Sequence, residues 1–393
     1  MTNPSSVCAL VLGGYINGYS IIRELHHNKV YNIWLFDYGT SLSRFSNRII
    51  GVTRIDRDAH SLLQAIDTLH KLYKKIVLYP TDDAQLELLL KIYPQIRNFC
   101  FIPFNETNLL ASLDKTQQYK YCDSLNIPYP TTVSIENVDD LKRLHDIQLP
   151  ILIKPNRRKD LSSPVFRSLF IEDSLSLSRS FTQLSKYLSQ GISFLASEFI
   201  PGDDTQIYAY TCYRSRNGEI LNDWIGKKLT QFPDFFGIFS SASNEAPDII
   251  KQQGRKLVAS MNLFGIVEPE FKLDKRDNKY KLMEINLRSM MWNRTGFLSG
   301  VNLAHTQWLD ATNQENIRQS QYFSPTVHQV YMKHEIINLL TRRRYFPYFY
   351  HNVLSRRPHF SVFDLNDPKP FFYDLATLPR TLFQICLKKL RAL

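Results

Sequence analysis

The stretch that decides the fold is GIVEPEFKLDKRDNKYKLMEINLR, residues 265–288. Its pattern indicates two β-strands joined by a polar turn, with acidic residues set among apolar ones. If the turn centres on Asp277, Glu270 faces Glu284 on the opposite strand. Like charges directly opposed across two strands destabilise a hairpin. The pattern therefore points to a divalent cation between these two carboxylates.

A divalent cation would reverse the sign of that repulsion. Alternation along the second strand places Glu284, Asn286 and Arg288 on one face, with Glu268 near Asn286. Two carboxylates and one amide oxygen suit Mg²⁺, which keeps waters and substrate phosphates as its other ligands. We therefore predict that Glu270, Glu284 and Asn286 bind Mg²⁺, with Mn²⁺ able to substitute. The alternative is a solvated hairpin with an acidic open face.

Two lysines upstream of the hairpin are candidate phosphate ligands. Lys115 is expected in the first turn of a helix that Asp114 caps, where the helix dipole disfavours a cation. Lys154 ends an apolar strand, LPILIKP (149–155), so its ammonium emerges at a defined place. Each lysine alone is also compatible with an ordinary surface position. Together with the hairpin, they suggest a phosphate clamp.

The first 110 residues alternate between strand and helix patterns. The strands are VCALVLGG (7–14), NIWLFD (32–37) and KIVLYP (75–80), with helices through Ile21–Leu25 and around residues 62–72. This alternation predicts a doubly wound parallel sheet, with ligand contacts at the carboxyl ends of its strands. Those ends carry Gly13, Gly14, Asn17, Gly18 and residues 81–83. Because GGYING is not GxGxxG, we favour a tight turn over a ligand-binding loop there.

A different pattern begins at residue 113. Strands and helices there indicate an antiparallel α+β unit. The segments are a helix at 114–127, the strands 149–155, 165–172, 192–200, 205–214 and 219–229, helices at 174–190 and 245–263, and the final hairpin. The predicted fold class is therefore α/β plus α+β.

The amino-acid composition limits the classes of protein to which the chain can belong. The 393 residues are 44% apolar and 22% charged, which is ordinary for a globular protein of two or three domains. No apolar run reaches the roughly 18 residues of a membrane span. The five cysteines lack metal or disulfide spacing, and we expect no secretory signal, so we expect a cytoplasmic protein. The net charge of +11 suggests anionic partners, namely nucleotide phosphates, acidic substrates, an anionic membrane face or nucleic acid, with solvated charge around a packed tail as the alternative. Of these partners we expect nucleotide and no nucleic acid.

In this order, the motifs resemble the ATP-grasp superfamily, and within it the D-aspartate-ligase-like carboxylate–amine ligases. The resemblance covers about residues 7–300. The matching segments are VLGGYINGYSIIREL, SLSRFSNRI, LDK with NIPYP, ILIKP, SEFIPGDD, GKKLTQFP, and EPEF with EINLR. It implies a Rossmann-like domain at 1–112, a two-lobed ATP-grasp domain with antiparallel sheets at 113–310 with a hinge near 198–202, and a basic, aromatic-rich extension at 311–393.

The resemblance also implies roles for individual residues. Those that would hold ATP are Lys115 and Lys154 at the phosphates, the backbone of Glu198, Phe199 and Ile200 at adenine, and Asp203 or Asp204 at the ribose. Lys227 or Lys228 would reach phosphate or substrate carboxylate. Arg288, with Lys154, would act catalytically by stabilising the transferred phosphate. Glu270, Glu284 and Asn286 would hold the metal.

The implied reaction activates a carboxylate as an acyl phosphate, which an amine then displaces, in cell-envelope or polysaccharide metabolism. Two alternatives stay open: a degenerate ATP-grasp binding or regulatory protein, and another ATP-grasp chemistry such as bicarbonate activation. A Rossmann oxidoreductase is disfavoured because the glycine fingerprint is lacking. One departure is NRRKDLSSP (156–164), which has no glycine where the family has a glycine-rich loop. We predict that Arg157, Arg158 and Lys159 supply charge there instead.

The C-terminal 63 residues are basic. Residues 331–393 hold 11 Lys or Arg against 4 Asp or Glu, a net charge of +7. From Arg380 onward, RTLFQICLKKLRAL predicts an amphipathic helix. We expect its apolar face to pack on the protein, with peripheral contact to an anionic membrane as the alternative. A homodimer is also left open.

Overall fold

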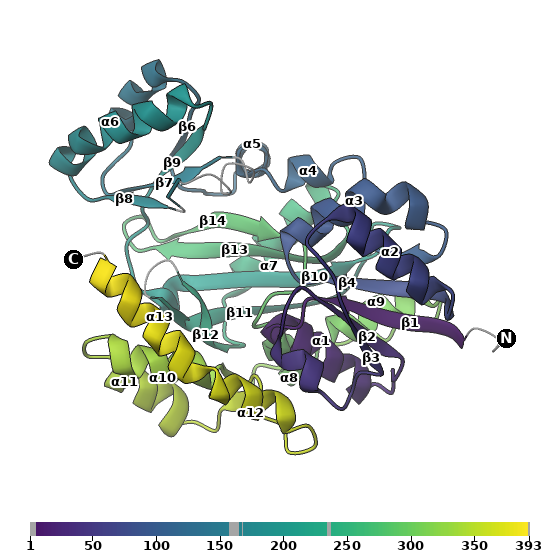
Figure 1. Ribbon diagram of the computed structural model, residues 1–393. Coiled ribbons are helices and arrows are strands. Elements are labelled where there is room, and N and C mark those ends of the chain that lie inside the picture. The colour runs from purple at the N-terminus through teal and green to yellow at the C-terminus, as the bar shows by residue number, and fades with distance from the viewer. Residues whose placement is uncertain (1–4, 157–164, 167, 234–236, 392–393) are drawn as a thin grey trace. The chain divides into compact units, whose positions relative to one another are not determined.

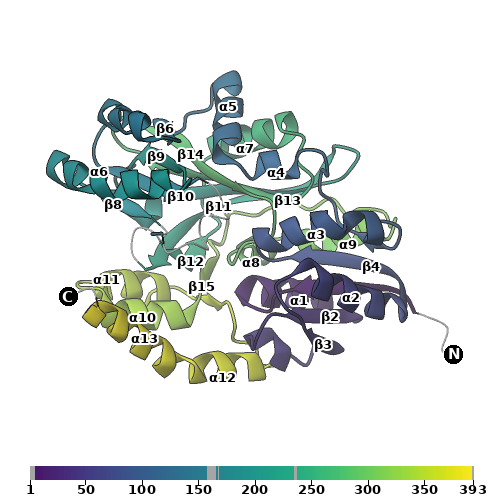
Figure 2. The ribbon, with the colours of Figure 1, turned by 45° about the horizontal axis from the view of Figure 1, so that its top comes forward.

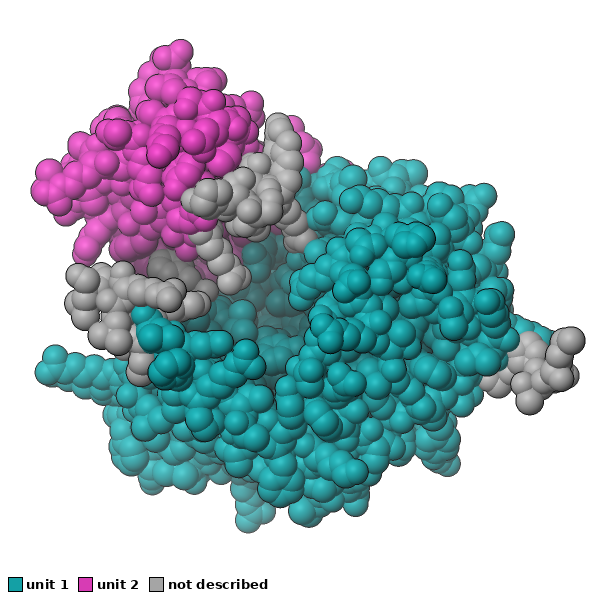
Figure 3. Space-filling view, viewed as in Figure 1, with its two compact units in different colours: residues 1–114, 203–271, 284–393 teal, residues 115–202, 272–283 magenta. Residues whose placement is uncertain are grey.

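The chain divides into two compact units in the computed structural model, which describes residues 5–156, 165–166, 168–233 and 237–391. Unit 1 comprises residues 1–114, 203–271 and 284–393, and unit 2 comprises residues 115–202 and 272–283 (Figure 3). This division differs from the predicted boundaries at 112/113 and 310/311. The hairpin tip groups with unit 2, and the C-terminal stretch groups with unit 1.

A five-stranded parallel sheet forms the N-terminal part of unit 1 (Figures 1 and 2). Its strands are β1 (Ser5–Leu12), β2 (Ile33–Asp37), β3 (Gly51–Arg54), β4 (Tyr73–Pro80) and β5 (Cys100–Phe101), in the order β3-β2-β1-β4-β5. The connecting helices are α1 (Ile16–His27), α2 (Ala59–His70) and α3 (Asp83–Ile96), with a short 3₁₀ turn η1 (Leu42–Phe45). The predicted doubly wound sheet is confirmed. Strands β3 and β5 and helix α3 were not predicted.

The β1–α1 connection is a tightly packed turn. Gly13 has a φ of +85°, a conformation that favours glycine. A Cβ added at Gly18 would lie 2.1 Å from the carbonyl oxygen of Gly13. The Asn17 amide donates to the carbonyls of Thr81, at 2.7 Å, and Ser289, at 3.2 Å. These contacts favour the structural interpretation of the glycines over a ligand-binding one.

A seven-stranded sheet continues the fold. Its strands are β10 (Ile207–Arg214), β11 (Ile220–Phe232), β12 (Ile238–Ser243), β13 (Gly265–Asp274), β14 (Lys279–Asn286), β15 (His328–Val330) and β16 (His359–Phe360), in the order β14-β13-β10-β11-β12-β15-β16. Thus β15 and β16, from the predicted C-terminal extension, add to the sheet beside β12. Two buried tryptophans, Trp224 and Trp292, belong to an apolar core that includes residues of β10, β11, β12 and β13.

Helices complete unit 1. They are α4 (Leu109–Ser112), α7 (Asp248–Ser260), α8 (Arg294–Leu298), α9 (Leu303–Ala311), α10 (Met332–Thr341), α11 (Phe346–Phe349), α12 (Lys369–Ala376) and α13 (Leu378–Arg391), with short helical turns at η4 (Asp204–Gln206) and η5 (Tyr350–Leu354). The helix predicted at 245–263 is shorter than expected. It begins only after Pro247, since proline restricts the residue before it away from helical conformation.

Unit 2 has its own four-stranded sheet. The strands are β6 (Thr132–Ile135), β7 (Ile151–Pro155), β8 (Leu169–Ile171) and β9 (Phe194–Glu198), in the order β6-β9-β7-β8, and all neighbours are antiparallel. The helices are α5 (Lys115–Leu125) and α6 (Ser174–Ser189), with a 3₁₀ stretch η2 (Val138–Asp146). Strand β8 is shorter than the predicted 165–172. An apolar core unites the sheet with α6 and η2.

The C-terminal helix forms as predicted but is not covered along its whole apolar face. Phe383 is 65% exposed and Leu387 is 37% exposed. The expected packing of the apolar stripe is therefore wrong for these two side chains. Contact with an anionic membrane stays a prediction. Among the described residues, no helix combines the length and apolarity needed to cross a bilayer.

Gly18→Ala tests the packed β1–α1 turn. Alanine normally stabilises a helix relative to glycine, but here its Cβ would meet the Gly13 carbonyl. We expect the variant to lose about 1–3 kcal/mol of unfolding free energy, measured by urea denaturation. Gly39→Ala is the control, since an added Cβ there meets nothing within 4 Å. A Gly18→Ala protein as stable as the parent would contradict this account of the turn.

Candidate functional site

A buried ion pair lies at the centre of the predicted metal ligands on unit 1. Glu270 on β13 is 8% exposed and Lys228 on β11 is 6% exposed. The Lys228 ammonium lies 2.6 Å from Glu270 Oε2. Burial lowers the pKa of Lys228, but Glu270, with smaller contributions from Glu268 and Glu284, raises it, and the pKa lies above the usual value for lysine, so the lysine remains charged. A lysine thus contacts the Glu270 side chain, for which the sequence predicted a metal ion as partner.

Glu268, two residues earlier on the same face of β13, is fully buried. Its Oε1 accepts a hydrogen bond from the Trp292 indole at 3.0 Å, and its Oε2 accepts one from the Thr211 hydroxyl at 2.9 Å. Burial raises the pKa of Glu268 to about 8, and the nearby Glu270 charge adds to this effect. Glu268 is therefore largely protonated at neutral pH and adds little negative charge beside Glu270.

Asn286 and Glu284 lie together near the end of β14. Asn286 is 5% exposed, and among the described residues its Nδ2 has no hydrogen-bond partner and its Oδ1 has a single contact, of 3.5 Å, from Arg288. Glu284 is partly buried. An amide oxygen with so little hydrogen bonding, close to carboxylates, is a suitable ligand for a hard cation. The residues present therefore suit Mg²⁺. Across the described ranges, no three His, Cys, Asp or Glu side chains gather as a metal group, and the predicted set contains only two carboxylates.

Arg288 is held by a partner that the sequence did not indicate. Asp83, in the first turn of α3, accepts from Arg288 Nε at 2.8 Å and from Nη2 at 3.2 Å. Such two-point pairing fixes the guanidinium plane. The predicted catalytic arginine is therefore oriented by the carboxyl-end region of the parallel sheet, where ligand contacts are expected.

The two lysines of GKKL have different partners. Lys227 lies 3.5 Å from Glu245, a half-exposed carboxylate, whereas Lys228 contacts the buried Glu270. Adjacent residues of a strand point to opposite faces, so the two lysines serve opposite faces of β11. Lys228, rather than Lys227, lies among the predicted metal ligands.

Both predicted phosphate lysines belong to unit 2. Lys115 begins α5 as expected, and its ammonium donates to the carbonyl of Met283 at 3.1 Å. Lys154 lies near the end of β7 and is exposed. Its neighbours along the strand, Ile151 and Ile153, are fully buried. Lys154 thus emerges from a packed strand end, as the sequence indicated.

The segment predicted to hold adenine is already engaged in backbone hydrogen bonds. Glu198 N donates to Thr131 O and Phe199 N donates to Pro150 O, both at 2.8 Å. The carbonyl of Ile200 accepts from Lys272 at 2.8 Å. A nucleotide would share the Ile200 carbonyl with Lys272, because a carbonyl oxygen has two lone pairs.

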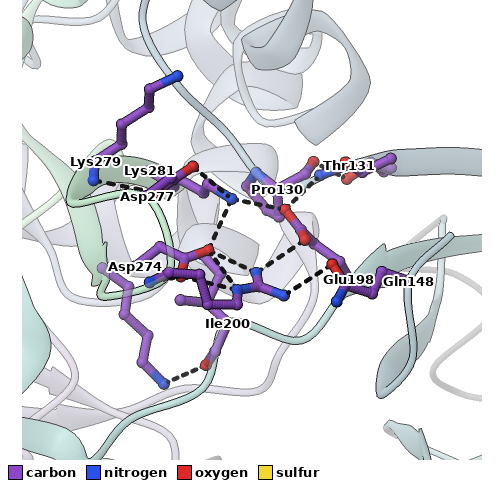
Figure 4. A network of polar contacts seen from close by, with 12 residues as sticks. Pro130, Thr131, Gln148, Glu198, Ile200, Asp274, Asp277, Lys279 and Lys281 are labelled. Carbon is purple, nitrogen blue, oxygen red and sulfur yellow. Dashed lines mark hydrogen bonds and ion pairs between the residues drawn. The ribbon is translucent and has the colours of Figure 1, made fainter.

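The Glu198 side chain belongs to a charge network of unit 2 (Figure 4). Glu198 accepts from Lys281 at 2.9 Å and from Arg276 at 2.9 Å. Asp274 also accepts from Lys281, at 2.8 Å, and from Arg276. Hydrogen bonds from Arg276 hold the pKa of Asp274 well below its usual range. This network ties the hairpin tip to β9.

The two predicted ribose ligands, Asp203 and Asp204, differ in their surroundings. Asp203 caps the short turn η4 through Thr205 N at 3.0 Å. Asp204 is 5% exposed and accepts from the backbone and side-chain nitrogens of Gln231 at 2.8 and 2.9 Å. Asp204 therefore stabilises β11 through these hydrogen bonds. Asp203 is exposed and is the better placed of the two to contact a ligand. The predicted basic residues Arg157, Arg158 and Lys159 lie outside the described residues.

Several contributors escaped sequence reasoning. Asp83 is separated from Arg288 by 205 positions, so no local pattern joins them. Lys272 and Arg276 lie in the hairpin among apolar and acidic residues, and no role was predicted for them. One signal was available: Asp82 and Gln85 form a capping box, which places Asp83 at a helix start.

The chain is similar to known proteins in sequence and in fold. No family model matches the chain. D-aspartate ligase from Enterococcus faecium (strain Aus0004) is 24% identical over 322 residues, covering 75% of this chain and 74% of that protein. The ADP complex of purK, N5-carboxyaminoimidazole ribonucleotide synthetase, superposes with a TM-score of 0.64 at 13% identity, covering 86% of each chain. L-amino acid ligase from Bacillus licheniformis gives a TM-score of 0.60 at 12% identity, covering 83% and 80%.

Those solved structures are ATP-grasp enzymes, and this chain shares their mixed α/β fold. The similarity to D-aspartate ligase extends over three quarters of both sequences. The chain therefore resembles ATP-grasp enzymes in fold and D-aspartate ligase in sequence.

Proposed function

We propose that this chain is an ATP- and Mg²⁺-dependent ligase that activates a carboxylate as an acyl phosphate and joins it to an amine. The observation that carries the proposal is the set of Glu270, Glu284 and Asn286 on neighbouring strands, with Arg288 held beside them. A sheet gains no stability from crowding buried carboxylates, so a ligand-binding role accounts for them better than packing does. The similarity to D-aspartate ligase supports the same chemistry.

The reaction needs charge neutralisation and positioning more than a protein nucleophile. The substrate carboxylate attacks the γ-phosphorus of ATP, the bond to the β,γ-bridging oxygen breaks, and ADP leaves. The amine then attacks the acyl carbon, phosphate departs and the amine loses a proton. Bound Mg²⁺ would neutralise phosphate charge. Arg288, oriented by Asp83, would stabilise the transferred group, and Lys115 and Lys154 would bind the phosphates.

Adenine would contact the backbone of residues 198–200, and Asp203 would meet the ribose. Lys228 replaces Lys227 as the lysine that we expect to reach a phosphate. Two of the similar proteins are named D-aspartate ligase and L-amino acid ligase. Amino acids are therefore the first substrates to test, with the carboxylate or the amine supplied by each.

Incubation with ATP and Mg²⁺ tests the function directly. We expect ADP and phosphate to form only when the mixture holds both a carboxylate and an amine substrate. Pools of D- and L-amino acids and of sugar acids, followed by mass spectrometry of the amide, would identify the pair. ADP binding without turnover in any pool would instead favour the degenerate binding protein, and bicarbonate-dependent turnover would favour the carboxylating alternative.

Glu284→Gln tests the metal ligands. Loss of one negative ligand should reduce Mg²⁺-dependent ADP formation on the order of 100-fold or more, since transferred charge is less well neutralised. Circular dichroism should show an intact fold, and Mn²⁺ binding by electron paramagnetic resonance should weaken in parallel. Glu245→Gln is the matched control, because Glu245 is half-exposed and pairs with Lys227. Retained turnover in Glu284→Gln would show that Glu284 is not a metal ligand.

Lys115→Ala and Lys154→Ala test the phosphate ligands. Each should weaken nucleotide binding by roughly 1.5–3 kcal/mol, the range for a hydrogen bond to a charged group. Isothermal titration with ADP measures this loss. Lys142→Ala, which removes an exposed lysine of the same unit, should leave the affinity unchanged. Equal affinities in all three variants would mean that Lys115 and Lys154 are surface residues.

A further inference from the structure

The contact between Lys228 and Glu270 has a consequence for metal binding. The ammonium lies 2.6 Å from Glu270 Oε2, and both side chains are more than nine-tenths buried. At that distance the lysine occupies one of the positions from which a cation would approach the carboxylate. Water cannot screen the pair, because neither side chain has appreciable contact with solvent. Lys228 and a metal ion therefore compete for the same oxygen.

Without a nucleotide, Lys228 is favoured over a metal ion in the competition for Glu270. A divalent ion on Glu270 would lie close to the Lys228 ammonium, and two positive centres in a buried place repel strongly. Displaced from Glu270, the ammonium would also be a buried charge without a direct partner, which is a costly state. Among the described residues, no second carboxylate lies within ion-pair distance of Lys228, and Glu268 and Glu284 act on its charge only from farther away. A phosphate group would provide the missing anion.

We infer that Lys228 is the resident counter-ion of Glu270 and yields this carboxylate to the metal only when a nucleotide phosphate receives its ammonium. This inference rests on the proposed function, since it takes Glu270 as a metal ligand. It adds an order to the binding steps: the metal binds weakly alone and tightly with nucleotide. No free metal ion is then held in the absence of ATP.

Lys228→Met tests the inference on the full-length protein. The variant keeps the length of the side chain and removes its charge. Electron paramagnetic resonance would measure Mn²⁺ affinity with and without ADP. Without nucleotide, we expect Lys228→Met to bind Mn²⁺ about tenfold more tightly than the parent, a change of about 1.4 kcal/mol. With ADP present, the advantage should disappear, because the parent lysine then has a phosphate partner.

Lys251→Met is the matched control. Lys251 forms an ion pair of 2.9 Å with Asp223, a buried carboxylate on the same strand β11. Loss of that charge should leave Mn²⁺ affinity unchanged in both conditions. Glu270→Gln combined with Lys228→Met should abolish the gain, and Lys228→Arg, which retains the charge, should keep metal binding weak if Lys228→Met proves unstable.

The outcomes separate the inference from the function on which it rests. If the parent binds Mn²⁺ with ADP but Lys228→Met gains nothing without it, the counter-ion role is wrong and the metal site stands. A gain that persists after Glu270→Gln, or that Lys251→Met reproduces, also overturns the role. If the parent binds no Mn²⁺ even with ADP, the proposed metal site itself is wrong.

Discussion

A carboxylate inside a folded protein must have a positive or hydrogen-bonding partner, and β13 carries two such groups into the sheet. Glu268 is satisfied by neutral donors, Thr211 and Trp292, and its pKa rises until it is largely protonated. Glu270 is satisfied by a cation, Lys228. The same strand thus holds one acid that meets neutral hydrogen-bond donors and one that meets a cation.

Glu268 and Glu270 are the same residue type, and their different surroundings give them different partners. Both lie on one face of β13, two positions apart, and both are at least nine-tenths buried. Burial and the nearby Glu270 carboxylate raise the pKa of Glu268, against the hydrogen bonds from a threonine on β10 and a tryptophan after β14, whereas Glu270 pairs with a lysine on β11. The orientation of Arg288 follows the same rule, because Asp83 reaches it from the start of α3.

The alternation of apolar and polar residues along the sequence predicted those features that depend on neighbouring residues alone. The parallel strands, the hairpin of residues 265–288 and the lysines at the start of α5 and near the end of β7 follow from alternation, proline positions and strand or helix ends. Pairings between distant segments could not be predicted in this way. GKKL offers two lysines, and only the register of β11 against its neighbours assigns Lys228 to Glu270.

Short elements were also missed for a physical reason. Strands β15 and β16 span three and two residues, too few for any alternation to be visible, so the C-terminal stretch looked like an appendage. Strand β3, GVTR, has one apolar residue that favours strands and is equally short. The predicted adenine-binding backbone could not be checked from sequence, because Thr131, Pro150 and Lys272 come from three separate segments.

The chain passes between its two units at 114/115, 202/203, 271/272 and 283/284. This route affects how the protein is made. On the ribosome, residues 115–202 emerge well before residues 272–283, which complete the same unit. Until the hairpin is synthesised, Glu198 lacks Arg276 and Lys281, and the Pro128 carbonyl lacks its hydrogen bond from Leu282. Unit 2 therefore cannot acquire its final charge network during translation until the polypeptide of the large sheet is nearly complete.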